Sequence, residues 1–376
     1  MTTVVILVIV TALVFDFTNG FHDTANAMAT SIATGALRPK VAVALSAVLN
    51  VAGAFLSTAV AKTISGGIVD DAKVTPAIIF GGLVGAIVWN LLTWLAGLPS
   101  SSSHALFGGL IGATWIASGS GAVHFDKVME KIVVPALASP LIAGFVAMVG
   151  TFTLYLMTRR ARKDVVTRDF RTGQVVSASL VSLAHGTNDA QKTMGVITLT
   201  LITAGQLPGG SGPPFWVILT AALAISAGTY LGGWRIIQTV GHKITDVVAP
   251  QGFAAESSAA AVILVSSHLG YALSTTHVAS GSVIGSGVGK RLSEVRWGVA
   301  GRMVTAWVLT LPAAALVGAL AGRLASSGTI GLLLVTAAAI VVGGGVWLVS
   351  RRNPVHAGNV NSVRPPAAAE PTAAAV

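Results

Sequence analysis

The chain has 376 residues, of which 53% are hydrophobic and only 10% are charged. Because soluble domains carry about 25% charged residues, this composition excludes a water-soluble globular protein. The lack of cysteine excludes disulfides, thiolate metal sites and cysteine nucleophiles. The net charge of +10 resides between apolar stretches, which indicates signals for membrane orientation rather than a surface for nucleic acid.

Apolar stretches of about twenty residues follow one another along the chain, and each can cross a hydrocarbon core of about 30 Å as a helix. Their continuous apolarity argues against a membrane β-barrel, whose strands alternate. We predict an all-α polytopic membrane protein of about 10–12 membrane segments. The short stretches 100–118 and 273–289 are predicted either to span the membrane or to re-enter it as hairpins. The predicted segments are 3–34 and 174–205 (both interrupted), 41–61, 76–97, 100–118, 132–157, 215–237, 252–270, 273–289, 297–320 and 329–349.

The basic residues predict how the chain is oriented. The strongest cluster is RRARKDVVTRDFR at 159–171, and cytoplasmic loops collect Lys and Arg. We therefore predict a basic cytoplasmic loop there, with the N-terminus outside and the C-terminus inside, in the cell (inner or cytoplasmic) membrane. The tail at 351–376 is rich in Pro and Ala and is predicted to be disordered.

Two motifs recur in the same order, which indicates an internal repeat. GFHDTANAMAT at 20–30 resembles GTNDAQKTMGV at 186–196, and SSSHALFGGLIG at 101–112 resembles STTHVASGSVIG at 274–285. An odd number of spans per half inserts the second copy from the opposite side, as in the inverted repeats of secondary transporters, and we expect the halves to rock about a midplane site. The predicted units are a first half at 1–157, a basic loop at 158–173, a second half at 174–322, an extra C-terminal helix at 323–350 and a tail at 351–376.

The first motif of each half places a carboxylate, Asp23 or Asp189, inside a long apolar span. The preceding residues, Asn19–Gly20 and Gly186–Asn188, are predicted to break the helix. A charge at membrane depth costs about 2.5–3.5 kcal/mol on insertion scales, so it is normally paired, cavity-facing or functional. Broken helices offer carbonyl groups to cations and N–H groups to anions. The alternative is that each Asp only caps a half-helix.

The second motif of each half places several hydroxyl groups before a His and a run of small residues. Ser and Thr favour helix N-caps, and a helix N-terminus presents N–H donors to an oxyanion. Two such clusters could enclose a tetrahedral anion, whereas ordinary capping and interhelical bonding is the alternative. His104 and His277 are expected to pack or cap. No Walker, HExxH or GxSxG motif is present, so we predict neither an enzyme nor an ATP-driven pump.

Taken together, NGFHDTANAMAT, HGTNDAQKTMG, GLPSSSSHALFGG, GFAAE and LSTTHVASGS resemble the inorganic phosphate transporter (PiT) family, over nearly the full length to about residue 350. The resemblance implies cation-coupled phosphate uptake through an inverted-repeat fold. By matching position, it implies a phosphate pocket of Ser101, Ser102, Ser103, Gln191, Ser274, Thr275 and Thr276. The expected cation-coupling residues are His22, Asp23, Asn26, Asn188, Asp189, Lys192 and Glu256.

The two copies of the first motif differ in ways that bear on the coupling ion. His22 stands before Asp23 where many family members have Asn, and Lys192 occupies the position of Asn26 in the other copy. Bacterial low-affinity members with the His–Asp form are linked to protons and divalent metal phosphates. Because His titrates near neutrality, we predict H⁺ rather than Na⁺ coupling, with Mg²⁺–phosphate as an alternative cargo.

The expected function is therefore a cation-coupled phosphate carrier with no cofactor and no resident metal. Sulfate transport by the same fold and an anion channel are the alternatives, and a membrane-embedded hydrolase is a more remote one. Phosphate, the coupling cation and the lipid bilayer are the expected partners, nucleic acid is not, and a homodimer is left open. Asp16 and Asn90 are further polar residues expected to be buried in apolar spans.

Overall fold

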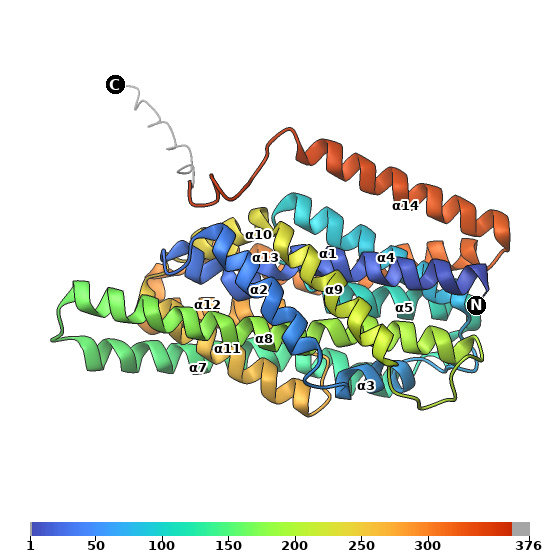
Figure 1. The fold of residues 1–376 in the computed structure, drawn as a ribbon, viewed down its shortest axis with the longest axis horizontal. Helices are drawn as coiled ribbons and strands as arrows, with labels where there is room; N and C mark the ends of the chain where they lie inside the picture. Colours follow the sequence, from blue (N-terminus) through green and yellow to red (C-terminus); the bar gives the residue numbers. More distant parts are fainter. Residues whose placement is uncertain (1, 363–376) are drawn as a thin grey trace, which may run out of the picture.

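The computed structural model describes residues 2–362, which form a bundle of helices lying side by side (Figure 1). Within that range there is no β-strand, apart from a single bridge between Val69 and Val123. The predicted all-α fold is therefore confirmed. The α-helices are α1 (Thr3–Ala33), α2 (Pro39–Ala54), α3 (Ala59–Gly67), α4 (Pro76–Ala96), α5 (Ser102–Ser118), α6 (Phe125–Val128), α7 (Val134–Thr158), α8 (Lys163–Thr203), α9 (Phe215–Leu231), α10 (Trp234–Gln238), α11 (Ala249–His268), α12 (Thr275–Lys290), α13 (Trp297–Ala325) and α14 (Thr329–Ser350).

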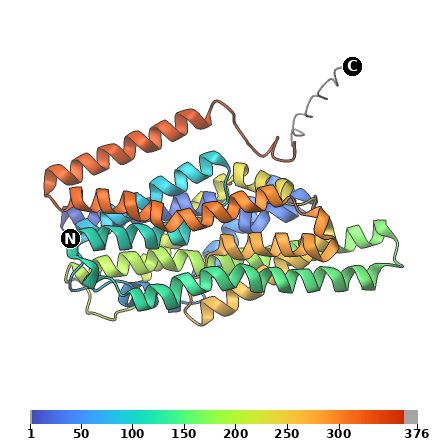
Figure 2. The same ribbon diagram turned by 180° about the vertical axis from the view of Figure 1, so that it is seen from behind.

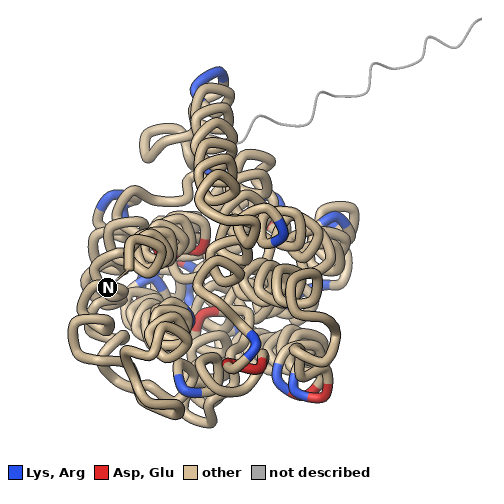
Figure 3. Tube along the Cα trace, turned by 90° about the vertical axis from the view of Figure 1, so that its right-hand side faces the viewer, with Lys and Arg blue, Asp and Glu red and all other residues tan. Residues whose placement is uncertain are grey.

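Five helical stretches of the described chain are long and apolar enough to cross a membrane, and the number rises to seven if two bent pairs count as spans. The bent pairs are α2 with α3, at 67°, and α9 with the helix Trp234–Lys243, at 58°. This is fewer full spans than the 10–12 segments expected, because helices such as α5, α8 and α12 are too short or too polar to qualify. Viewed end-on, the bundle shows how sparse its charged residues are (Figure 3).

The breaks predicted inside the first segment of each half are wrong. Both α1 and α8 continue as helices through Asn19–Gly20 and Gly186–Asn188. The glycines serve close packing instead: a methyl group added at Gly20 would lie 2.1 Å from the Ile225 carbonyl oxygen, and one at Gly186 would lie 2.3 Å from that of Asn50. Small residues let membrane helices approach in this way.

The two short segments lie in helical hairpins. α5 has 17 residues and α12 has 16, so each rises only about 25 Å, less than a hydrocarbon core. The end of α5 returns to the start of α4, where the Ser118 hydroxyl donates to the Lys73 carbonyl at 2.7 Å. The end of α12 likewise lies beside the start of α11, where the Gln251 amide donates to the Ser286 carbonyl at 3.4 Å. These contacts favour re-entrant hairpins over complete spans.

The basic segment predicted as a loop at 158–173 is helical from Lys163 onward. The ends of α7 and α8 project together beyond the rest of the bundle (Figures 1 and 2). Charged side chains of this extension are exposed and pair with one another, as Arg162 does with Asp164 at 2.8 Å. A solvated, charged helix therefore replaces most of the expected loop.

The disorder predicted for 351–376 is wrong for the described part of the tail, and residues 363–376 lie outside the described residues. The Arg235 guanidinium on α10 donates to the carbonyl oxygens of Ser350 and Asn353, at 2.8 and 2.6 Å. Val360 is 0% exposed. Hydrogen bonds to the backbone and one buried apolar side chain hold this stretch against α10.

We expect Gly228→Ala to destabilise the protein, because a methyl group there would lie 2.0 Å from the Phe17 carbonyl oxygen. Overpacking of this kind costs about 1–3 kcal/mol. The matched control is Gly344→Ala on α14, where a methyl group meets no atom of the described chain within 4 Å and a helical alanine is favoured by about 0.5–1 kcal/mol. Thermal unfolding in detergent measures both variants, and equal midpoints would contradict the close α1–α9 contact.

Candidate functional site

The buried apolar residues form two clusters, and the polar site lies between them. On α1 one cluster ends at Phe15 and the other begins at Ala25, while on α8 the boundary falls between Ala184 and Ala190. The intervening segments carry the two Asp residues singled out from the sequence, and both are at most 1% exposed. A polar layer inside a membrane bundle is typical of an ion or substrate pathway.

Asp23 accepts hydrogen bonds from hydroxyl groups on two other helices. Ser102 Oγ on α5 donates to its Oδ2 at 2.8 Å, Thr276 Oγ1 on α12 donates to its Oδ1 at 3.3 Å, and Thr275 Oγ1 lies 3.4 Å from its Oδ2. His22 Nδ1 lies 2.6 Å from Asp23 Oδ1. The carboxylate thus sits among donors, all of them buried.

Asp189 is held by an ion pair as well as by hydroxyl groups. The Lys192 ammonium, one turn further along α8, pairs with its Oδ1 and also donates to Ser103 Oγ at 2.5 Å. Thr275 Oγ1 donates to Asp189 Oδ2 at 3.0 Å, and His185 Nε2 lies 3.1 Å from the same oxygen. Lys192 is 0% exposed, so its charge is balanced inside the bundle.

Thr275 joins the two carboxylates, because its hydroxyl lies within hydrogen-bond distance of both Asp23 and Asp189. Asn26 extends the contact, since its amide nitrogen donates to Thr275 Oγ1 at 3.3 Å and to Thr276 Oγ1 at 3.1 Å. Residues from both copies of both motifs are therefore brought together at one place, as the repeated motifs predicted.

Two of the predicted pocket hydroxyls cap helices instead of facing the carboxylates. Ser101 Oγ accepts from the His104 amide at 3.1 Å, and Ser274 Oγ accepts from the His277 amide at 3.2 Å. These caps fix the N-termini of α5 and α12 inside the bundle. The following residues then project their hydroxyls, and each N-terminus keeps the partial positive charge that favours anions.

Gln191 and Asn188 point away from this central cluster. Gln191 Oε1 accepts from the amides of Val60 and Ala61 at the start of α3, at 2.8 and 3.2 Å. The Asn188 amide donates to Ser267 Oγ at 2.8 Å. In this arrangement both side chains tie α8 to neighbouring helices and make no hydrogen bond to Asp23, Asp189 or the hydroxyl clusters.

Glu256 lies in a second polar cluster. Its carboxylate accepts hydrogen bonds from Thr30 and Ser31 at 2.6 Å each, from Ser177 at 2.5 Å and from Gln174 at 3.2 Å. Thr30 is seven residues from Asp23 on α1, which corresponds to about 10 Å of helix. Glu256 is thus buried, with neutral donors, away from the central carboxylates.

His104 and His277 pack against one another, with ring centroids 4.8 Å apart. Both line a cavity of about 730 Å³ between α7, α12 and α13, whose other walls are mainly apolar. Their backbone amides take part in the helix caps described above. The rings therefore have the packing role expected of them.

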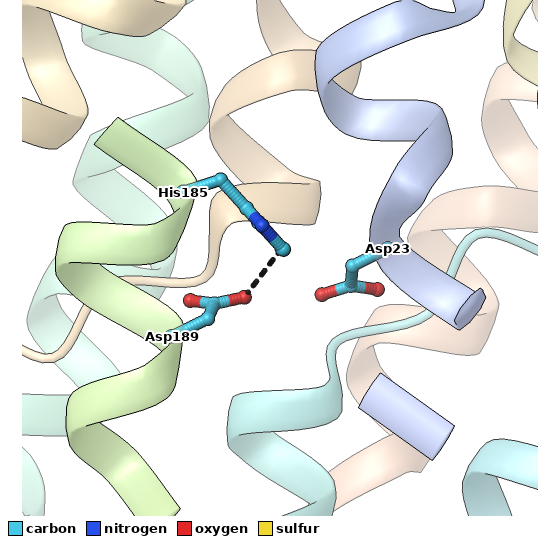
Figure 4. Close-up of side chains that lie close together, drawn as sticks. All are labelled: Asp23, His185 and Asp189. Atoms are coloured by element: carbon cyan, nitrogen blue, oxygen red, sulfur yellow. Dashed lines mark ion pairs between the residues drawn. The ribbon is translucent and has the colours of Figure 1, made fainter. Parts of the chain in front are cut away.

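His185 is a site residue that sequence reasoning missed. Asp23, His185 and Asp189 offer ligand atoms that all lie within 4.8 Å of one another, although no metal site was expected (Figure 4). The signal was the four-residue spacing of His185 and Asp189, which places both on one face of a helix. One imidazole and two carboxylates are a donor set that suits a divalent cation.

The fold and the site together define a membrane transporter: helices long enough to span a bilayer surround buried carboxylates, an ammonium group and hydroxyl donors. The model of the phosphate transporter family matches residues 19–166 and 156–318. The chain belongs to this family of transporters and is not an enzyme.

The descriptions of similar proteins agree with this family assignment. A "probable low-affinity inorganic phosphate transporter" of Mycobacterium bovis is 60% identical over 360 residues, covering 95% of this chain and 86% of the relative. One of the same description from Bacillus subtilis is 45% identical, covering 84% and 95%. A solved structure titled "The sodium-dependent phosphate transporter" superposes with a TM-score of 0.77 at 26% identity, covering 85% of this chain and 98% of that one.

We expect Lys192→Met to destabilise the protein by about 3–5 kcal/mol, because it leaves the Asp189 carboxylate buried without its cation. Adding Asp189→Asn to this variant removes the uncompensated charge and should recover most of the loss. Unfolding midpoints of the two single variants and the double variant form a double-mutant cycle. Strictly additive effects would show that the pair does not couple.

Proposed function

We propose that this chain is a cation-coupled secondary transporter that takes up inorganic phosphate. The observation that carries the proposal is the meeting of two helix N-termini, α5 and α12, beside two buried carboxylates. The N-termini and their hydroxyls suit a tetrahedral oxyanion, and the carboxylates suit the cations that accompany it. The family and the names of the relatives support phosphate as the anion.

The anion would bind where hydroxyls now donate to carboxylates. Ser102, Ser103, Thr275 and Thr276 lie in the first turns of the two short helices and can turn their donors toward phosphate. The Lys192 ammonium adds a fixed positive charge next to Ser103. Neutral donors and one shared cation would hold phosphate without binding it too tightly for release.

The two halves are proposed to be an inverted repeat with unequal charges. Asp189 already has a cation of its own chain, Lys192, whereas Asp23 has His22 and the neutral Asn26 nearby. The mobile coupling cation is therefore assigned to Asp23, and the adjacent imidazole favours a proton. Glu256, whose carboxylate accepts hydrogen bonds from neutral groups, is proposed as a further cation-coupling residue.

A divalent metal would enter as cargo together with phosphate. Asp23, His185 and Asp189 converge closely enough to contact such an ion. The orientation proposed is N-terminus outside and C-terminus cytoplasmic, in the inner membrane, because the basic extension of α7 and α8 belongs on the cytoplasmic side.

Proteoliposome uptake of labelled phosphate, under separate H⁺ and Na⁺ gradients and with and without Mg²⁺ at two pH values, tests the coupling. We expect accumulation under the H⁺ gradient, and uptake driven by Na⁺ alone would refute proton coupling. Excess unlabelled sulfate separates a phosphate carrier from a sulfate permease. Phosphate concentrated above its external level excludes a channel.

We expect Asp23→Asn to lower gradient-driven uptake at least tenfold, because the amide cannot exchange a proton or balance a cation. Asp189→Asn should do the same, since it leaves the Lys192 charge without its partner. Uptake is measured per molecule of protein recovered in the membrane. Wild-type uptake by both variants would refute the assignment of the two carboxylates.

A further inference from the structure

Asp16 lies on α1 and is not part of the contacts described above. It is 0% exposed, and neither carboxylate oxygen makes a hydrogen bond within the described chain. A carboxylate inside a membrane bundle is normally paired or lines an ion pathway. Asp16 therefore lacks the partner that its burial calls for.

Two neutral side chains beside Asp16 are also buried without a hydrogen-bond partner. Asn19 on α1 and Thr193 on α8 flank the carboxylate, and both are 0% exposed. Neither the Asn19 amide nor the Thr193 hydroxyl makes a hydrogen bond among residues 2–362. Asn90, on the adjacent helix α4, is also buried with both amide atoms unbonded to the described residues. Asn19 and Thr193 thus lie beside the Asp16 carboxylate without an aligned hydrogen bond, as oxygen ligands of a shared cation do.

The position of these groups links them to the central site. Asp16, Asn19 and Asp23 follow at three- and four-residue intervals, so they share one face of α1. Asp16 and Asp23 are separated by seven residues, or about 10 Å of helix. Thr193 directly follows Lys192 on α8. The group thus lies toward the N-terminal end of α1, one step along the same face from the central carboxylates.

The surrounding charges leave Asp16 unbalanced. The charged groups acting on it are Asp189 and Lys192 on α8. Lys192 already forms an ion pair with Asp189 and donates a hydrogen bond to Ser103. The helices α4 and α9, which also pack against α1, contain no Asp, Glu, Lys, Arg or His. The Asp16 carboxyl group therefore has no cation of the described chain to itself.

We propose that Asp16, Asn19 and Thr193 form a second site for a monovalent cation, H⁺ or Na⁺, distinct from the central carboxylates. The inference rests on the proposed function, because a cation bound there is one that drives phosphate accumulation. A cation entering from the N-terminal end of α1 meets this site before it reaches Asp23.

The experiment separates coupling from phosphate handling. Wild type, Asp16→Asn and Asp16→Glu are reconstituted with the matched control Thr18→Val, whose hydroxyl donates only to its own helix at Phe15. Two rates are measured: accumulation under an H⁺ or Na⁺ gradient, and exchange of labelled for unlabelled phosphate with equal cations on both sides. We expect Asp16→Asn to lose accumulation at least tenfold more than exchange. Asp16→Glu should restore accumulation to within about threefold, and Thr18→Val should match wild type in both rates.

A readout without phosphate keeps this inference separate from the proposed function. Binding of labelled Na⁺ to the purified protein, and the infrared band of a protonated carboxylic acid, compare wild type with Asp16→Asn. We expect the variant to bind one cation fewer in one of the two measurements, and that measurement names the ion. The proposal is overturned if wild type and Asp16→Asn agree in both binding measurements. It is also overturned if the variant accumulates phosphate as wild type does, or if it loses exchange and accumulation equally. If wild type carries no phosphate, the proposed function fails, and these binding measurements still decide the site.

Discussion

Asp189 and Lys192 form an ion pair with both side chains 0% exposed. Removing two charges from water costs several kcal/mol per ion, and the pair is stable only if hydrogen bonds satisfy the remaining donors and acceptors. Those bonds come from Ser103 on α5 and Thr275 on α12, two helices that begin inside the bundle. The N-termini of the two hairpin helices therefore supply hydrogen bonds that this buried ion pair uses.

Much of the fold could be predicted from the sequence, because length and apolarity are local properties. The all-α class and the positions of most helices follow from that pattern. The number of full spans does not, and whether 100–118 and 273–289 span the membrane or re-enter it was left open. Where glycines break or permit a helix could not be predicted. In the sequence, Gly20 and Gly186 look the same as glycines that break a helix. Only the backbones facing them, of α9 and α2, show that they allow close packing instead. The contact of Arg235 with the Asn353 carbonyl likewise joins residues distant in sequence, which the composition of the tail did not predict.

For the candidate site, the recurrence of the two motifs in the same order predicted that two Asp residues and two hydroxyl clusters meet. The structure has them in contact. The sequence did not separate residues that face the centre from those that cap or tie helices, as Ser101, Ser274 and Gln191 do. That distinction depends on side-chain direction. His185 was missed because its counterpart in the first copy is Asn19, so the repeat gave no pairing signal.

The glycine contacts have a mechanical consequence. Gly20 and Gly228 join α1 to α9, while Gly53 and Gly186 join α2 to α8, and each contact crosses from one sequence half to the other. Backbones that touch cannot slide or separate without losing their packing. Moving one sequence half against the other would therefore break these contacts. Helices of the two halves pack together in mixed groups, α4 and α5 with α13, and α7 with α11 and α12.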